Sequence, residues 1–299
     1  MDTQNLRAFQ VVAERSSFSE AADVLHLTQP AVSKRIAVLE GQLNCRLFDR
    51  IGRKISLTEA GLALLPKAQR ILQEVADAQG MIRDLSGEVG GSLSVVTSHH
   101  IGLHRLPNVI QQFSQQYPEV SLDLNFLDSE KAYEAILHGE FELAIITLAP
   151  TPHPKITSHN IWSDQLQFVV APKHRLAQNS STSLKESSTS LKELSAFPAI
   201  LPTLNTYMGN LIKGLFDRRK LPLKLTIPTN YLETIKMMVS IELGWSVLPE
   251  TMIDSQLVKL NINGLQLTRQ LGCIYHKERS LSNAANAFLQ VAIKSAVST

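Results

Sequence analysis

The chain has 299 residues, of which 44% are hydrophobic and 19% charged, and its formal net charge is +2. This length favours about two domains, and the apolar fraction is too high for a disordered protein. Charges interrupt every long apolar stretch and the first residues are polar, so we expect neither a signal peptide nor a membrane span. Two cysteines without a CxxC pairing are typical of a reducing cytoplasm, the compartment we expect for this protein.

Three short helices are predicted in the first part of the chain. The spacing of apolar residues predicts a helix over 5–14, with its inward face formed by Leu6, Phe9, Val12 and Ala13. Ser19 is the expected cap of a second helix that runs through His26. Thr28 is the expected cap of a third helix with Pro30 in its first turn, where a missing N–H is tolerated.

The third predicted helix has one apolar face and one polar face. Its inward residues are expected to be Val32, Ile36, Leu39 and Leu43. Its outward residues are then Gln29, Pro30, Ser33, Lys34 and Ala37. Short side chains allow close approach to the major groove, and amide and hydroxyl groups can read base edges there. Lys34 and Arg35 are placed to meet phosphates on either side.

A basic hairpin is predicted after the third helix. Residues 47–50 and 54–57 alternate as two strands that turn around Gly52, with Arg50, Arg53 and Lys54 at the tip. Residues 30–57 contain six basic and two acidic residues, whereas residues 1–29 contain two basic and four acidic ones. A basic surface of this kind favours a polyanion as partner, although charge alone is also compatible with an ordinary solvated surface.

Three helices followed by a basic hairpin form a winged helix-turn-helix, and the sequence resembles the LysR-type transcriptional regulators. The resemblance lies in FSEAADVLHLTQPAVSKRIAVLE at 18–40, LFDR at 47–50 and LTEAG at 57–61. At 41–44 the chain has GQLN where the family usually has an acidic residue and then Leu-Gly; Asn44 also accepts left-handed backbone angles. The candidate DNA contacts are Ser19, Thr28, Gln29, Pro30, Ala31, Ser33, Lys34, Arg35, Arg50 and Arg53.

The resemblance implies a regulator that binds a partly palindromic site on double-stranded DNA as a dimer or tetramer, with RNA polymerase as a further candidate partner. A helix is predicted from Thr58 to about Gly87, with Pro66 expected to bend or restart it. Its apolar stripe comprises Leu65, Ala68, Leu72, Val75 and Ile82. In the family this helix links and dimerises the subunits; the alternative is a helix that folds onto its own domain.

Residues from 91 onward alternate between strand and helix patterns. Strands are expected at 93–97, 120–126, 143–147, 167–171, 199–201, 223–226 and 245–248, and helices at 103–117, 130–138, 207–219 and 232–242. This order favours a parallel sheet covered by helices. The fold class we expect is α+β multidomain: a winged helix-turn-helix at 1–58, a linker helix at 59–90 and a two-lobed α/β sensor at 91–299. The sensor resembles periplasmic binding proteins, with lobe I at about 91–162 and 268–299 and lobe II at about 163–267.

Ligands of open α/β folds bind beyond the carboxyl ends of the strands. This rule selects Ser98, His99, His100, Thr147, Thr203 and Thr229 as candidate effector contacts. Hydroxyls, imidazoles and helix-start N–H groups together favour a carboxylate or another small anion. Each of these residues is equally compatible with a role as a helix cap or in closing a loop.

Other chemistry has less support. His99, His100 and His104 could bind a metal, but Ile101 stands where a zinc protease motif has Glu, and no cysteine or carboxylate lies nearby in the sequence. We therefore expect no metal, no cofactor and no enzyme. Direct redox sensing through Cys45 and Cys273, or pH sensing through these histidines, remains an alternative to ligand sensing. A solute-binding component would need export and would not need the basic amino-terminal module. A metal-dependent enzyme would need a complete ligand set, which the segment 99–104 does not supply.

A short duplication lies in the second lobe. STSLKES at 181–187 is followed by STSLKEL at 188–194, identical at six of seven positions. Surface loops accept such insertions at small entropic cost. The hypothesis is that one copy is dispensable for folding and alters how the lobe moves or packs.

Overall fold

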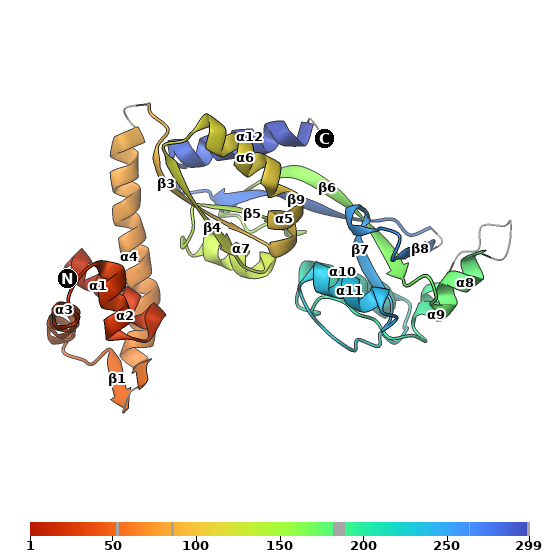
Figure 1. The fold of residues 1–299 in the computed structure, drawn as a ribbon, viewed down its shortest axis with the longest axis horizontal. Coiled ribbons are helices and arrows are strands. Elements are labelled where there is room, and N and C mark those ends of the chain that lie inside the picture. The colour runs from red at the N-terminus through yellow and green to blue at the C-terminus, as the bar shows by residue number, and fades with distance from the viewer. Residues whose placement is uncertain (52–53, 85–86, 182–188, 263, 298–299) are drawn as a thin grey trace. The chain divides into compact units, whose positions relative to one another are not determined.

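The computed structural model describes residues 1–51, 54–84, 87–181, 189–262 and 264–297. Contacts divide the chain into two compact units, residues 1–88 and 89–299 (Figure 1). No helix among the described residues is both long and apolar enough to span a bilayer. The Arg53 prediction and half of the duplication, residues 182–188, lie outside the described residues; within the second copy, Ser190 forms a capping box with Glu193.

The first unit consists of the predicted three helices, hairpin and long helix. Its elements are α1 (Thr3–Arg15), α2 (Phe18–Leu25), α3 (Gln29–Leu43), β1 (Phe48–Ile51), β2 (Lys54–Leu57) and α4 (Glu59–Asp84). Ser17, not Ser19, caps α2: its Oγ accepts a hydrogen bond from the Glu20 amide at 3.2 Å. Ser19 lies inside the first turn, where its side chain is exposed. Asn44 adopts the expected left-handed conformation, with φ of 52°.

The core of this unit is formed by one face of each helix. Val32, Ile36 and Leu39 of α3 are buried as expected, but Leu43 is 36% exposed. After the left-handed turn at Asn44 the chain inserts Leu47 into the core instead, so the inward stripe of α3 ends one turn early. The first half of α4 packs into the same core through Ala68. The helix continues through Pro66, so the expected restart is wrong.

The second unit contains a seven-stranded sheet with flanking helices. Its elements are β3 (Gly91–Thr97), α5 (His99–His104), α6 (Leu106–Gln116), β4 (Val120–Phe126), α7 (Ser129–Leu137), β5 (Leu143–Thr147), β6 (Ile156–Val170), α8 (Arg175–Ser181), α9 (Leu191–Leu194), α10 (Tyr207–Arg218), α11 (Leu232–Ser240), β7 (Ser246–Pro249), the 3₁₀ turn η1 (Glu250–Met252), β8 (Val258–Leu260), β9 (Leu267–His276) and α12 (Asn283–Val297).

The sheet is mixed, which corrects the expectation of a parallel one. The order is β4-β3-β5-β9-β6-β7, with β8 also paired to β6. Among the described strands, β3 pairs in parallel with β4 and β5, whereas β9 is antiparallel to both β5 and β6. The long antiparallel pair β6 and β9 runs through both halves of the unit, because the chain crosses between them twice (Figure 1).

Each half of the second unit has its own hydrophobic core, and we call the halves lobe I and lobe II. In lobe I, α6 and α12 cover one face of the sheet and α7 covers the other (Figure 1). Successive residues of β3 and β5 therefore alternate between two apolar layers, which explains why β5 and the last three residues of β3 are almost fully buried. In lobe II, α10, α11 and β7 pack around Trp245, which is fully buried.

Three predicted elements of this unit were wrong in detail. The strand expected at 199–201 is only an isolated pair of bridges, from Ala199 to Leu225 and to Trp245. The helix expected at 103–117 is two helices, α5 and α6, separated at Arg105. Pro107 lies in the first turn of α6, and its nitrogen has no hydrogen to continue the preceding turn. Residues 223–226 are not a strand but make a single bridge from Leu225 to Ala199. Pro222 and Pro228 flank this segment, and neither can donate to a ladder.

Candidate nucleic-acid interface and ligand cleft

The outward face of α3 is small, polar and basic. Gln29 and Lys34 are exposed, Ser33 is half-buried, and the Gln29 amide nitrogen donates to Ser33 Oγ at 3.2 Å. Thr28 and Pro30 are exposed at the start of the helix, and Ala31 is half-buried. This face has what reading base edges requires: short side chains that allow close approach, amide and hydroxyl groups, and a flanking cation.

Contacts within the unit fix the edges of this face. Arg35 Nη2 donates to Gln4 Oε1 of α1 at 2.8 Å, so its guanidinium is held beside the first turn of that helix. Glu40 Oε1 accepts from the Leu47 amide at 2.7 Å and thereby ties the last turns of α3 to the start of the hairpin. In that hairpin Arg50 of β1 pairs with Ile55 of β2.

One stripe of α4 continues beyond the core that covers its start. Ala68 is fully buried, whereas Val75 and Ile82, seven and fourteen residues further on, are 38% and 71% exposed. A seven-residue spacing places all three side chains on the same side of the helix. The second half of α4 therefore presents an apolar surface that its own unit leaves uncovered.

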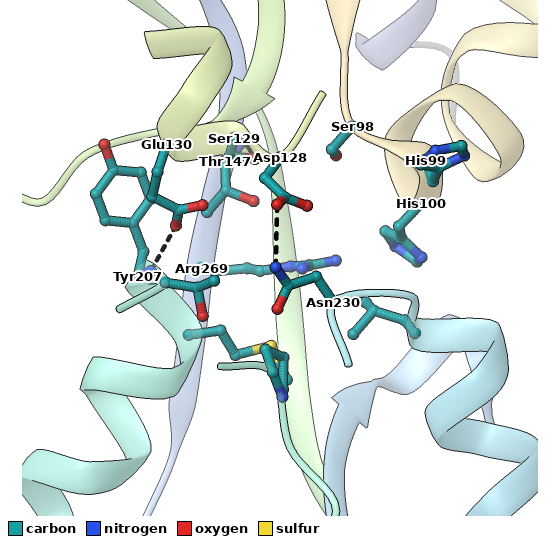
Figure 2. A pocket seen from close by; sticks show the side chains of 14 residues that line it. Ser98, His99, His100, Asp128, Ser129, Glu130, Thr147, Tyr207, Asn230 and Arg269 are labelled. Carbon is teal, nitrogen blue, oxygen red and sulfur yellow. Dashed lines mark hydrogen bonds between the residues drawn. The ribbon is translucent and has the colours of Figure 1, made fainter. Parts of the chain in front are cut away.

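A cavity lies between lobe I and lobe II (Figure 2). Its lining comes from both lobes and consists of Ser98, His99, His100, Asp128, Ser129, Glu130, Thr147, Pro202, Thr206, Tyr207, Met208, Asn230, Leu232 and Arg269. Two hydrogen bonds cross it: Asn230 Nδ2 donates to Asp128 Oδ2 at 3.0 Å, and the Tyr207 amide donates to Glu130 Oε1 at 2.6 Å (Figure 2). The cavity volume is about 70 Å³, well below the roughly 300–1,000 Å³ of common ligand sites. The lobes are closed.

A buried ion cluster forms one wall of the cavity. Asp164 of β6 is almost fully buried, and its carboxylate accepts from Arg269 Nε at 3.0 Å, Arg269 Nη2 at 2.8 Å and Arg105 Nη2 at 2.5 Å. Burial alone would raise the pKa of Asp164, but the nearby His100 ring and the two guanidiniums outweigh it and hold that pKa far below its ordinary value. Asp164 is therefore an anion that fixes both arginines.

Histidines of α5 face Glu233 of α11 across the lobes. His104 Nε2 lies 2.9 Å from Glu233 Oε1. His100 is 5% exposed, and within the described part of the chain neither of its ring nitrogens has a hydrogen-bond partner. Burial lowers the pKa of His100 more than the Asp164 carboxylate raises it. The ring is thus neutral near pH 7.

Family models match both units. Residues 3–62 match the bacterial regulatory helix-turn-helix of the lysR family, and residues 86–296 match the LysR substrate binding domain. The chain belongs to the LysR family. It is a transcriptional regulator with a helix-turn-helix and an effector-binding domain.

Two relatives of this LysR-type regulator match nearly all of its length and about a third of it, respectively. A probable RuBisCO transcriptional regulator of Synechocystis is 32% identical, with 95% of this chain and 84% of the relative covered. An uncharacterized HTH-type regulator of Azotobacter vinelandii is 63% identical over 107 residues, 36% of this chain and 74% of that protein.

Solved structures share the fold. CbnR in complex with its target DNA is 23% identical with a TM-score of 0.69, and 99% of this chain and 100% of that chain are covered. The effector-binding domain of QuiR with shikimate is 20% identical with a TM-score of 0.60, and 70% of this chain and 98% of that chain are covered.

The cavity contains four of the six predicted effector contacts. Ser98, His99, His100 and Thr147 line it. Thr203 is not among the lining residues and holds Asn230 instead, because its amide and hydroxyl both donate to Asn230 Oδ1 at 3.0 Å. Thr229, also outside the lining, accepts from the Tyr231 amide at 3.4 Å.

Sequence reasoning missed the charged half of the cleft. Asp128, Glu130 and Asn230 follow predicted elements closely enough that the strand-end rule could have included them. Arg269 offered no such signal, because β9 was not predicted and the position of Arg269 beside Asp164 depends on the pairing of two distant strands. No local pattern indicates Glu233 either, because it lies 129 residues from His104 in the sequence.

The cysteines of this regulator occupy packed positions. Cys273 of β9 is fully buried in lobe I, and burial raises the pKa of its thiol far above the ordinary value. Cys45 is half-buried and packs against the core of the first unit. A thiol that stays protonated is a poor nucleophile, so the redox alternative has little support at Cys273.

Proposed function

We propose that the regulator binds a small anionic effector in the cavity between the lobes. The observation that carries this proposal is Arg269, whose side chain is 10% exposed and lines the cavity. Nε and Nη2 of Arg269 donate to Asp164, and no hydrogen bond among the described residues engages Nη1. Ser98, Ser129 and Thr147 add hydroxyl groups around the same space. An oxyanion would accept from these donors.

The size and closure of the cavity define the expected ligand. A volume of about 70 Å³ suits a few non-hydrogen atoms, and a larger ligand requires the lobes to separate. Effector binding changes the regulator only if the ligand prefers one lobe arrangement over another. A ligand that favours the closed lobes would strengthen the two hydrogen bonds across the cleft, and a ligand that favours open lobes would break them.

DNA recognition is proposed for the outward face of α3. Gln29, Pro30 and Ser33 would enter the major groove, while Lys34, and Arg35 beside α1, would meet phosphates. The exposed Val75 and Ile82 of α4 would pack against a second copy, because an apolar helix face of this kind needs a partner. A dimer would present two α3 helices to the two halves of a partly palindromic site.

Calorimetry with the full chain tests the effector proposal. The probes are sulfate, phosphate and a series of small carboxylates, and we expect one of these anions to bind saturably. Ser98→Ala and Thr147→Val should weaken that binding by tenfold or more, whereas Thr229→Val, outside the cavity, should leave it unchanged. Equal loss in all three variants, or no saturable anion, would refute the proposal.

Gel-shift titrations at several salt concentrations test the DNA interface. Ser33→Ala should reduce discrimination between cognate and random DNA. Lys34→Ala should weaken binding to both DNAs alike. It should also reduce the slope of log binding constant against log salt concentration by about one. Lys173→Ala, an exposed cation of the other unit, is the matched control. If Ser33→Ala lowers cognate and random binding equally, the serine does not read bases.

Sedimentation tests the dimer. Ile82→Glu should shift the protein toward monomer. Leu62→Glu, at an equally exposed α4 position on nearly the opposite side of the helix, should not.

A further inference from the structure

We propose that His100, His104 and Glu233 form a site for a transition-metal dication of the Zn²⁺ class, which would bridge the two lobes. One potential ligand atom from each residue lies within 4.8 Å of the other two. The two histidines stand at i and i+4 on α5 of lobe I, and the carboxylate comes from α11 of lobe II. His100 also lines the cavity of the proposed anion, but the metal assignment does not require that anion.

The distances are close to those of a bound metal. His104 Nε2 lies 2.9 Å and His100 Nδ1 3.8 Å from Glu233 Oε1. Tetrahedral zinc with bonds of about 2.0–2.1 Å separates neighbouring ligand atoms by about 3.3 Å. All three ligand atoms lie within 4.8 Å of one another, so side-chain shifts of up to about 1.5 Å would bring them into coordination, with a fourth position left for water.

The unpartnered ring of His100 is an independent indication of a ligand. A buried imidazole whose two nitrogens both lack a hydrogen-bond partner is costly in a folded protein. A metal on Nδ1 would satisfy one nitrogen. The other, Nε2, lies 3.7 Å from Asp164 Oδ2 and would donate to that carboxylate after a small rotation. Metal-binding histidines commonly have this outer carboxylate partner.

The surrounding charges and access also suit a metal. Arg269 and Arg105 stand near His100, but Asp164 pairs with both, and Glu233 supplies a further negative charge. His104 and Glu233 are 35% and 38% exposed, so the site is reachable. A groove of about 310 Å³ lies beside Glu233 and is also lined by His99 and Tyr231.

A metal in this site would stabilise the closed lobes. Its ligands come from both lobes, so only the closed arrangement offers all three, and the ion would favour that arrangement. No carboxylate lies near these histidines along the chain, and for that reason no metal was expected; in the folded protein α11 supplies one.

The experiment uses full-length protein stripped of metal with a chelator and titrated with Zn²⁺, and with Co²⁺ as an optical probe. We expect one Zn²⁺ per chain and a visible Co²⁺ spectrum typical of nitrogen and oxygen ligands. His104→Ala should weaken Zn²⁺ binding at least about 100-fold, because loss of outer-shell partners alone costs about 10–100-fold. Glu233→Gln, which keeps a hydrogen-bonding group beside His104, should weaken it similarly. His138→Ala, at an exposed histidine outside the cluster, is the matched control.

A second measurement reports the bridge. Zn²⁺ should slow hydrogen exchange at the Tyr207 amide, which donates across the cleft, in the wild-type protein and not in Glu233→Gln. Absence of saturable binding, unchanged affinity in both cluster variants, or equal weakening in His138→Ala would overturn the proposal. Tight binding without slower exchange at Tyr207 would overturn the bridging role.

Discussion

Asn230 of lobe II joins the two lobes through a single side chain. Its Nδ2 donates to Asp128 Oδ2 of lobe I at 3.0 Å, while its Oδ1 accepts from both the amide and the hydroxyl of Thr203. The side-chain amide is therefore held by lobe II through its oxygen and bonds to lobe I through its nitrogen. The orientation of this one side chain therefore links the two lobes at the cavity.

Asn230→Asp should open the lobes. The aspartate still accepts from Thr203, but it faces Asp128 with a like charge. Hydrogen exchange at the Tyr207 amide should accelerate, since that amide bonds across the same cleft. In the double variant Asn230→Asp with Asp128→Asn, the new amide at 128 donates to the new carboxylate at 230. The contact across the cleft is restored, and slow exchange should return. Slow exchange in the single variant would show that this contact does not hold the lobes.

Asp164→Asn should destabilise the second unit by about 3–5 kcal/mol, because it leaves Arg269 and Arg105 buried without a counter-charge. Urea unfolding measures the loss. The matched control is Asp217→Asn, which breaks the exposed pair with Lys213 and should cost no more than about 1 kcal/mol. Similar losses in both variants would mean that burial of the cluster is unimportant.

Gly61→Ala should destabilise the first unit by about 1–3 kcal/mol or more. A Cβ at Gly61 would lie 2.2 Å from the Leu47 carbonyl oxygen, which is backbone and cannot rotate away. Gly41→Ala on α3 meets no atom within 4 Å. It should stabilise the helix by up to about 1 kcal/mol, because alanine is the better helix former. Thermal and urea melts of the two variants should move in opposite directions.

Cys273 should resist modification. Its thiol is fully buried and its pKa is raised, so iodoacetamide at pH 8 should label Cys45 well before Cys273 in folded protein, and both equally in urea. Mass spectrometry of the two peptides gives the rates. Rapid labelling of Cys273 in the folded state would contradict this prediction and would support direct redox sensing through Cys273.

His174 should make stability fall in mild acid. Burial lowers its pKa more than the Glu242 charge raises it, and its Nδ1 accepts from the Leu176 amide at 3.2 Å. Below the ordinary histidine pKa of about 6.5 the unfolded chain binds a proton that the folded chain refuses. The free energy of unfolding should therefore decrease as pH falls from about 7 toward the folded-state pKa. His174→Asn keeps the acceptor and should flatten this slope, whereas His138→Asn, at an exposed site, should not.

The sequence by itself determined the class of protein and the elements of the first unit, apart from the cap of α2, the end of the α3 stripe and the continuity of α4. The helices of this unit are short-range structures, and their caps, apolar stripes and turn residues are encoded within a few positions, as with Val32, Ile36 and Asn44. The strand-end rule also selected Ser98, His99, His100 and Thr147, because β3 and β5 have clear patterns.

Only the tertiary structure decided the composition of the cleft. Arg269 meets Asp164 through the pairing of β6 with β9, and His104 meets Glu233 through closure of two lobes. Neither contact can be predicted from the periodicity of the sequence, because each joins residues more than a hundred positions apart. Long-range pairing brings together charges that local patterns cannot relate.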